Sequence, residues 1–146
     1  MPEKEKLREK LVSFATEQLG KPYKYGAKPA KNPKDFDCSS FVQYVYKKIR
    51  INLPRTAIEQ ARCGKKVNNR KKLKAGDLIF MKGIVGRYNS EFPEGIGHVA
   101  MHIGDNKIIQ VKYKKNKDGS DDGKVFIEKA EKILNRKDLR VIKRII

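Results

Sequence analysis

The sequence predicts an α+β domain in which N-terminal helices pack on an antiparallel β-sheet. Apolar residues recur at helical spacing up to about Ala61, whereas the second half carries short apolar runs typical of strands. The turn-forming residues Gly104-Asp105-Asn106 separate two of these runs, which is a strong hairpin signal. Helices first and hairpin-linked strands afterwards are typical of an α+β domain rather than of a doubly wound sheet.

Three helices are predicted in the first half. The first runs from Lys4 to Leu19, carries one apolar face and ends at Gly20. Residues 21–37 are rich in Pro, Gly, Lys and Asn and predict an irregular loop. A second amphipathic helix runs from Cys38 to Arg50, and a short helix follows from about Thr56 to Ala61.

The second half predicts strands in an antiparallel meander. A turn at 73–77 precedes them, and the runs of strand type are 78–81, 98–103, 107–111, 125–127 and 139–146, with a helical turn at 130–134. No internal repeat is visible, and no linker divides the chain. We therefore expect residues 1–146 to form one domain, since this length is that of an ordinary domain.

The chain is strongly basic. It carries 35 Lys and Arg against 17 Asp and Glu, a formal net charge of +18. Such an excess attracts polyanions, among them nucleic acid, anionic lipid and acidic wall polymers. The lysines are scattered and no segment carries a nucleic-acid motif, so we expect contact with anionic polymers but no specific nucleic acid.

Neither a membrane span nor a secretory leader is visible. No stretch approaches the roughly 20 consecutive apolar residues that cross a bilayer, so we expect no integral membrane segment. The first residues, Met1-Pro-Glu-Lys-Glu-Lys6, contain no apolar core of a leader. We expect a secreted or wall-associated protein if a leader was removed or lies outside this sequence, and otherwise a cytoplasmic one. We also expect a monomer.

Cys38 is the predicted nucleophile. It lies where the loop passes into the second helix, and Asp37 or Ser39 can cap that helix. Unpaired N–H groups at a helix start stabilise a thiolate and can also hold the oxyanion of a tetrahedral intermediate. The other cysteine, Cys63, lies where a short helix runs out into Gly64, and we expect a half-buried thiol without chemistry.

A cysteine nucleophile needs a histidine and a third polar group. The chain has two histidines, His98 and His102, which alternation places on one face of the same strand. His98 opens the strand beside a glycine-bearing loop, so it is the better candidate to reach a cleft. On the next strand, Gln110 can accept the other imidazole N–H, and the order Cys, His, amide matches the papain-like arrangement.

Each of these residues also has an ordinary structural interpretation. A cysteine before an apolar helix is often a core residue, and a strand histidine is often structural. The combination of the three favours the catalytic interpretation. Two histidines and scattered carboxylates do not form a metal-ligand set, so we expect neither a metal nor a cofactor.

Several segments resemble successive motifs of the NlpC-type peptidoglycan cysteine peptidases. They occur in the family order and are Pro22-Tyr-Lys-Tyr-Gly26, Phe36-Asp-Cys-Ser-Ser-Phe-Val42, Leu53-Pro-Arg-Thr56, Ala75-Gly-Asp-Leu-Ile-Phe80, His98-Val-Ala-Met-His-Ile-Gly104 and Ile108-Ile-Gln-Val111. The resemblance implies a papain-like α+β fold. It also implies hydrolysis of amide bonds in cell-wall stem peptides, often after a γ-linked D-glutamyl residue.

The resemblance also assigns roles. Cys38 is similar to the family nucleophile and His98 to its base, and Gln110 falls at a third polar position that is most often histidine. The residues similar to those that line the site or bind the free amino end of the stem peptide are Tyr23, Asp37 and Ser39. Two positions depart from the family pattern, because Ser40 and Ala27 stand where glycine is usual, which puts substrate fit in question.

Two alternatives remain open. The same fold and triad can serve an amidase at the sugar–peptide junction or an acyl transferase. A non-catalytic, basic polyanion-binding module is the second alternative, although such a module has no use for a Cys–His–Gln set.

Overall fold

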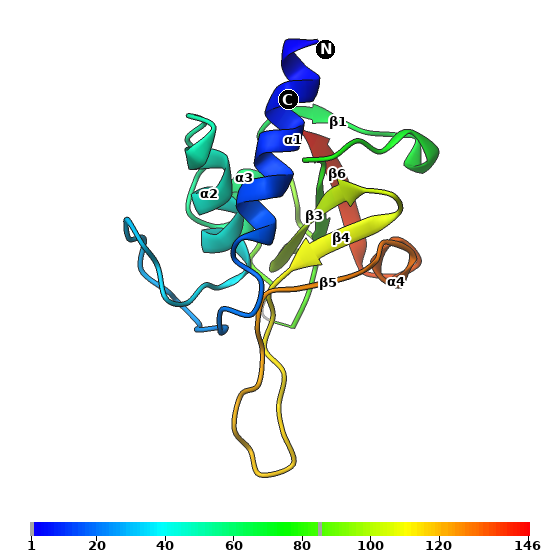
Figure 1. Ribbon diagram of the computed structural model, residues 1–146. Coiled ribbons are helices and arrows are strands. Elements are labelled where there is room, and N and C mark those ends of the chain that lie inside the picture. Colours follow the sequence, from blue (N-terminus) through cyan, green and yellow to red (C-terminus); the bar gives the residue numbers. More distant parts are fainter. Residues whose placement is uncertain (1, 85) are drawn as a thin grey trace.

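The computed structural model describes residues 2–84 and 86–146 (Figure 1). Its helices are α1 (Glu3–Thr16), α2 (Cys38–Lys48), α3 (Ala57–Gln60) and α4 (Glu131–Leu134), with a 3-10 helix η1 (Arg70–Lys72). Its strands are β1 (Lys65–Lys66), β2 (Leu78–Met81), β3 (His98–Gly104), β4 (Lys107–Gln110), β5 (Phe126–Lys129) and β6 (Leu139–Arg144). Helices packed on an antiparallel sheet confirm the predicted α+β class.

The six strands form one antiparallel sheet in the order β1-β6-β2-β3-β4-β5. Strands β2 to β5 are neighbours in chain order, as the predicted meander requires. The last strand departs from it, because β6 returns to the free edge of β2 and pairs there, with Ile79 opposite Ile142. Asp105 and Asn106 form the β3–β4 turn with φ of 51° and 56°, the left-handed conformation that a tight hairpin turn needs.

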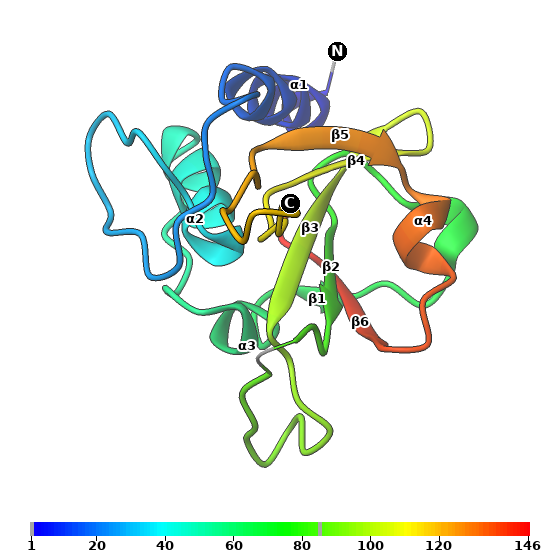
Figure 2. The ribbon, with the colours of Figure 1, turned by 90° about the horizontal axis from the view of Figure 1, so that it is seen from below.

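Both faces of the sheet are buried. Helices α1 and α2 cover one face, whereas α4 lies on the other side (Figure 2). Val99 and Met101 point into the hydrophobic core on the side of α1 and α2, and Ala100 between them points into the core on the side of α4. The side chains of β3 therefore contact apolar neighbours on both faces, which explains its continuous apolar sequence.

The start of α2 is fixed by a capping box. The Asp37 carboxylate accepts the N–H of Ser40 at 2.8 Å, and the Ser40 hydroxyl accepts the N–H of Asp37 at 2.9 Å. Both residues are buried. Reciprocal capping of this kind satisfies N–H groups that the helix leaves unpaired, so the first residue of α2, Cys38, is held in a defined position.

The first helix is shorter than its pattern predicts. It ends at Thr16, and residues 17–20 continue as turns to Gly20, whose φ of +86° is the left-handed conformation expected of a stop signal. Leu19, which the pattern places on the helix, is 45% exposed. Since Leu19 buries little surface, no packing holds the last turn in the helix.

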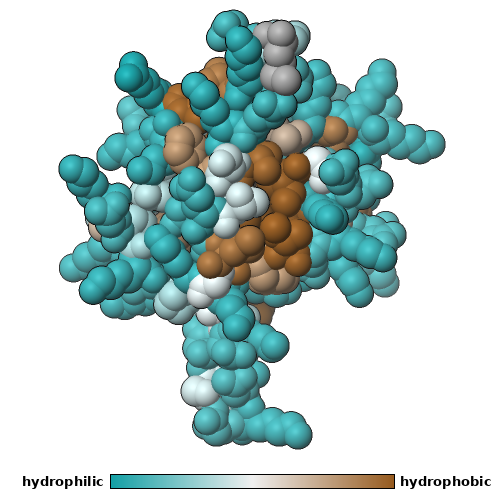
Figure 3. Space-filling model, in the orientation of Figure 1, coloured by the Kyte–Doolittle hydropathy of each residue, from teal (hydrophilic) through white to brown (hydrophobic). Residues whose placement is uncertain are grey.

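Hydrophilic side chains cover most of the face shown in Figure 3, and an apolar area lies near its centre. The loop from β4 to β5 projects from the body of the protein and is covered by hydrophilic side chains (Figures 1 and 3). Among residues 2–84 and 86–146, no helix is long and apolar enough to cross a membrane.

Candidate active site

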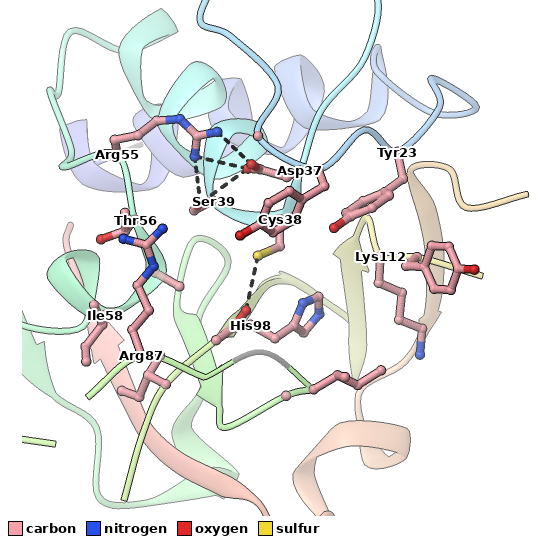
Figure 4. Close-up of a pocket in the computed structure, with 18 of the residues that line it drawn as sticks. Tyr23, Asp37, Cys38, Ser39, Arg55, Thr56, Ile58, Arg87, His98 and Lys112 are labelled. Carbon is pink, nitrogen blue, oxygen red and sulfur yellow. Dashed lines mark hydrogen bonds and ion pairs between the residues drawn. The ribbon is translucent and has the colours of Figure 1, made fainter. Parts of the chain in front are cut away.

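A cleft of about 700 Å³ opens at the N-terminus of α2 (Figure 4). Its walls come from the loop after α1, the segment around Thr56, the loop that joins β2 to β3, and the start of the loop after β4. Tyr23, Asp37, Cys38, Ser39 and His98 all line it, whereas Gln110 lies behind His98. Residues from distant parts of the sequence therefore meet in one cleft.

Cys38 is the first residue of α2 and is half-buried against the start of β3. Its Sγ lies 3.8 Å from the carbonyl oxygen of Gly97, the residue before His98 (Figure 4). The thiol thus lies beside the predicted base and faces the cleft. Both cysteines, Cys38 and Cys63, are free thiols.

His98 and Gln110 are joined by a hydrogen bond of 2.7 Å between Nε2 and Oε1. In the β3–β4 register Met101 lies opposite Ile109, so one step further places Ala100 opposite Gln110. His98 and Gln110 are therefore diagonal neighbours on one face, within reach of long side chains. The small side chain of Ala100 leaves the imidazole room to reach the amide.

His102 does not contribute to the cleft. It lies opposite Ile108 in the sheet, is 4% exposed, and its Nδ1 accepts the N–H of Gly104 at 3.2 Å. Its position deep in the strand gives it a structural environment. The strand-end argument thus selected the histidine that lines the cleft.

The Gln110 amide determines which imidazole nitrogen carries the proton. Its Nε2–H donates to the carboxylate of Glu128 on β5, so its Oε1 faces His98. An amide oxygen can only accept, and His98 therefore donates from Nε2–H and keeps a lone pair on Nδ1. This tautomer leaves Nδ1 as the nitrogen that can take a proton from a thiol.

Burial shifts the pKa of both reacting groups toward their neutral forms. Burial raises the pKa of the Cys38 thiol to about 11, although the backbone N–H groups of Val99 and Ser39 act in the opposite direction. Burial likewise lowers the pKa of His98 to about 4, although the hydrogen bond that the imidazole donates to Gln110 acts in the opposite direction. Desolvation of the charged thiolate therefore acts against the stabilising N–H groups at the helix start.

Arg55 forms an ion pair with the carboxylate of Asp37. Its guanidinium binds both carboxylate oxygens at 3.1 and 2.6 Å, and also contacts the Ser39 hydroxyl at 2.9 Å and the Ala27 carbonyl at 2.8 Å. The motif Leu53-Pro-Arg-Thr56 pointed to this segment but gave Arg55 no role. An ammonium group arriving at Asp37 would share the carboxylate with Arg55.

Tyr23 points into the cleft (Figure 4). Its ring packs edge-on against Tyr113, with centroids 6.3 Å apart and an interplanar angle of 68°. Burial, followed by the proximity of Cys38 and Asp37, raises the pKa of the Tyr23 hydroxyl to about 12. The hydroxyl therefore stays a neutral hydrogen-bonding group near the thiol.

The two departures from the family pattern lie outside the cleft lining. Ser40 is buried in the capping box of α2, and Ala27 is 1% exposed with its carbonyl bound to Arg55. Neither side chain lines the cleft, so any effect on substrate fit would act through its neighbours.

The cleft walls are basic. Four cations line them, Arg55, Arg87, Lys112 and Arg136, against one carboxylate, that of Asp37. Arg55 is paired with Asp37 and Arg136 with Asp138, whereas in the described part of the chain Arg87 and Lys112 make no ion pair. Arg87 lies on the side of Thr56 and Ile58, and Lys112 on the side of Tyr23 (Figure 4). Within residues 2–84 and 86–146, no three His, Cys, Asp or Glu side chains gather as a metal site would require.

Comparison with known protein families decides the relationship. The profile of the NlpC/P60 family matches residues 20–134, which include the cysteine, both histidines and Gln110. The chain belongs to the NlpC/P60 family. Its papain-like fold and the family resemblance seen in the sequence are thereby confirmed.

Individual NlpC/P60 proteins agree with this assignment. A probable endopeptidase p60 of Listeria welshimeri is 34% identical over 122 residues, covering 80% of this chain and 21% of the relative. A gamma-DL-glutamyl hydrolase of Bacillus subtilis is 37% identical over 103 residues, covering 69% of this chain and 22% of the relative. The crystal structure of an NlpC/P60 family protein from Bacillus cereus superposes with a TM-score of 0.68 at 28% identity, covering 94% of this chain and 39% of that protein. The chain thus spans about a fifth of the length of these two curated relatives.

Proposed function

We propose that this chain is a cysteine endopeptidase that hydrolyses amide bonds in peptidoglycan stem peptides. The observation that carries the proposal is the Cys38 thiol at the start of α2 beside His98, whose other nitrogen is held by Gln110 at 2.7 Å. A nucleophile, a base and a group that orients the base are the parts that acyl transfer needs. Relatives named endopeptidase and gamma-DL-glutamyl hydrolase support the substrate class.

The reaction starts from the neutral pair. Nδ1 of His98 takes the Cys38 proton as the sulfur attacks the carbonyl carbon, and backbone N–H groups at the start of α2, including that of Cys38, stabilise the oxyanion. The imidazolium then protonates the leaving amine, and the C–N bond breaks to leave a thioester. Water gives a proton to Nδ1, attacks the thioester and releases the carboxylic acid and the thiol.

The finer proposal is cleavage after a γ-linked D-glutamyl residue. This linkage leaves the α-carboxylate of the residue free beside the scissile bond, and the cleft offers the cations Arg87 and Lys112 to receive an anion. Tyr23, Asp37 and Ser39 form the wall that we propose receives the amino-terminal side of the stem peptide. The basic surface favours approach to an anionic wall, an effect that salt screens.

Digestion of purified peptidoglycan, followed by mass spectrometry of the products, tests the proposal. Endopeptidase action predicts fragments with a new carboxyl terminus at D-glutamate and a new amino terminus on the next residue. Release of intact stem peptides from the sugar would instead show an amidase, and an acyl product on an added amine acceptor would show a transferase. Absence of any new product would remove the enzymatic proposal and leave the polyanion-binding module.

Replacing Arg87 should weaken recognition of the free carboxylate. The backbone of Arg87 is held by an antiparallel bridge, in which its N–H donates to the Ile96 carbonyl at 2.9 Å and its carbonyl accepts the Ile96 N–H at 2.8 Å. A guanidinium can bind a carboxylate through two parallel hydrogen bonds. Wild type should cleave L-alanyl-γ-D-glutamyl-L-lysine with kcat/KM about tenfold above that for the D-isoglutamine analogue, a typical effect of one charge-assisted hydrogen bond. Arg87→Gln should bring this ratio close to one.

Lys112→Gln is the matched control, since it removes the other cleft cation without a fork-shaped donor. We expect it to lower kcat/KM equally for both peptides. A ratio that stays unchanged in Arg87→Gln, or collapses only in Lys112→Gln, contradicts the assignment of the carboxylate to Arg87.

The pH dependence should show a wide plateau. Protonated His98 cannot accept the thiol proton, and its lowered pKa of about 4 places the acid limb of kcat/KM below the ordinary imidazole value of 6.5. The raised pKa of Cys38, about 11, means that the thiol still carries its proton in the alkaline range, so the neutral pair persists there. We expect kcat/KM on the same peptide to vary by less than roughly threefold between about pH 6 and 9. An acid limb at 6.5, or an alkaline limb at the ordinary thiol value of 9.0, contradicts the neutral pair.

A further inference from the structure

We propose that Glu128 is a positioning residue of the active site, which sets the His98 tautomer by orienting the Gln110 amide. The proposal rests on the proposed function, because it explains how His98 is prepared to act as a base. Its carrying observation is a chain of side chains across three strands, from His98 on β3 through Gln110 on β4 to Glu128 on β5.

The sheet register places the three side chains on one face. Gln110 lies opposite Phe126, and Ile108 lies opposite Glu128, so Gln110 and Glu128 are diagonal neighbours, as His98 and Gln110 are. Glu128 is half-buried on the edge strand of the sheet, where its carboxylate reaches the amide. Glu128 is therefore placed relative to Gln110 as Gln110 is placed relative to His98.

The chemistry of the groups gives the chain of hydrogen bonds one direction. A primary amide presents an acceptor on one side and a donor on the other, so either end can face the histidine. An ionised carboxylate accepts only, and Glu128 therefore draws Nε2 of Gln110 toward itself. The amide oxygen is left facing His98, which must then carry its proton on Nε2 and keep Nδ1 free for Cys38.

The neighbouring cations leave the Glu128 carboxylate to this role. The hydrogen bonds to Asp138 raise the pKa of Arg136, and the nearby charge of Glu128 adds to this effect, but both guanidinium contacts, at 2.8 and 2.9 Å, go to Asp138. Lys112 places its Nζ over the Phe126 ring, 5.8 Å from the centroid. The family position that most often holds histidine is a glutamine here, and an amide needs such an external group because rotation would otherwise reverse it.

Glu128→Lys is the sharpest test. A lysine ammonium donates only, so it should hold Oε1 of Gln110, turn the amide Nε2–H toward His98 and force the proton onto Nδ1. Glu128→Gln removes the constraint, since its own amide can either accept from Gln110 or donate to it, so neither direction is imposed. Glu131→Lys makes the same charge change at the exposed first residue of α4 and is the matched control.

Two measurements are made on each variant of the 146-residue chain. Nitrogen-15 NMR of histidine-labelled protein reports the tautomer without substrate, and a His98→Gln spectrum assigns the signals of the two histidines. The second measurement is kcat/KM on L-alanyl-γ-D-glutamyl-L-lysine. Wild type and Glu131→Lys should show protonated Nε2 and activities within roughly threefold. Glu128→Gln should show both tautomers, and Glu128→Lys should show protonated Nδ1 and lose about 100-fold or more, the scale of general-base catalysis.

A Glu128→Lys protein that keeps the Nε2 proton and wild-type activity overturns the proposal, as does a wild type with the proton on Nδ1. If Glu128→Lys does not fold, as circular dichroism would show, Glu128→Ala replaces it. A free amide should then give a mixture of both tautomers, and a pure Nε2 tautomer overturns the proposal. If wild type cleaves no stem peptide, the proposed function fails while the NMR result still decides the role of Glu128.

Discussion

Cys38→Ala should abolish cleavage of stem peptides while the protein stays folded. The variant removes the one sulfur that lies beside His98 in the cleft, and no other side chain there can form the thioester. Loss of a nucleophile from a Cys–His or Ser–His pair costs on the order of 10⁴-fold or more in kcat, because base and orienting group act only through it. Because Cys38 is a small, half-buried side chain, the melting temperature should change by only a few degrees.

Cys63→Ala is the matched control for this variant. Cys63 is half-buried at the end of α3, where its thiol contacts the Glu59 carbonyl at 3.7 Å, and it does not line the cleft. Both variants remove one thiol, so kcat/KM on purified muropeptides should fall only for Cys38→Ala. Equal activity of Cys38→Ala and wild type would contradict the thioester mechanism, and loss of activity in Cys63→Ala would show that the assay follows folding rather than chemistry.

The sequence pattern predicts local elements of this fold better than their pairing. Alternation and turn residues place β2, β3 and β4 within about a residue of their ends, because each run has its own turn signal. The position of β6 is different. Val141 and Ile142 are buried on opposite faces, so β6 shows no alternation of apolar and polar residues. Its pairing with β2 depends on contacts between residues far apart in the sequence. The two-residue strand β1, Lys65–Lys66, carries no apolar residue and gives no signal.

The same distinction applies to the site. Cys38, His98 and Gln110 can be predicted because each lies beside a local signal: a helix start, a strand start and a polar residue in an apolar strand. Arg55 and Glu128 cannot, since each contacts a partner 18 residues away through tertiary structure. Glu128 also follows three apolar residues and precedes Lys129, so no alternation assigns it to a face of β5. Residues that orient a site through another side chain have no pattern of their own.

Asp77→Ala should destabilise the fold by about 3 kcal/mol, the largest effect we expect outside the cleft. The Asp77 side chain is 1% exposed, and its carboxylate binds Arg144 through two hydrogen bonds of 2.9 and 2.7 Å and the N–H of Lys74 at 2.8 Å. Removing it leaves the guanidinium unpaired where β6 meets the start of β2. Arg144 is 28% exposed, so water relieves part of this cost and the effect lies at the lower end of the range for buried pairs.

Thermal unfolding measures this effect, and a loss of about 3 kcal/mol corresponds to a melting temperature lower by roughly 10 °C for a chain of this size. Glu91→Ala is the control, because its pair with Arg62 is 3.6 Å long and exposed on both sides, and it should cost less than about 1 kcal/mol. The double variant Asp77→Leu with Arg144→Met removes both charges and should recover most of the loss. If Asp77→Ala is no worse than Glu91→Ala, the ion pair does not hold β6 in place. Since β6 pairs along the whole of β2, and β2 carries β3 with His98, a loosened β6 should also lower the activity at temperatures well below the melting point.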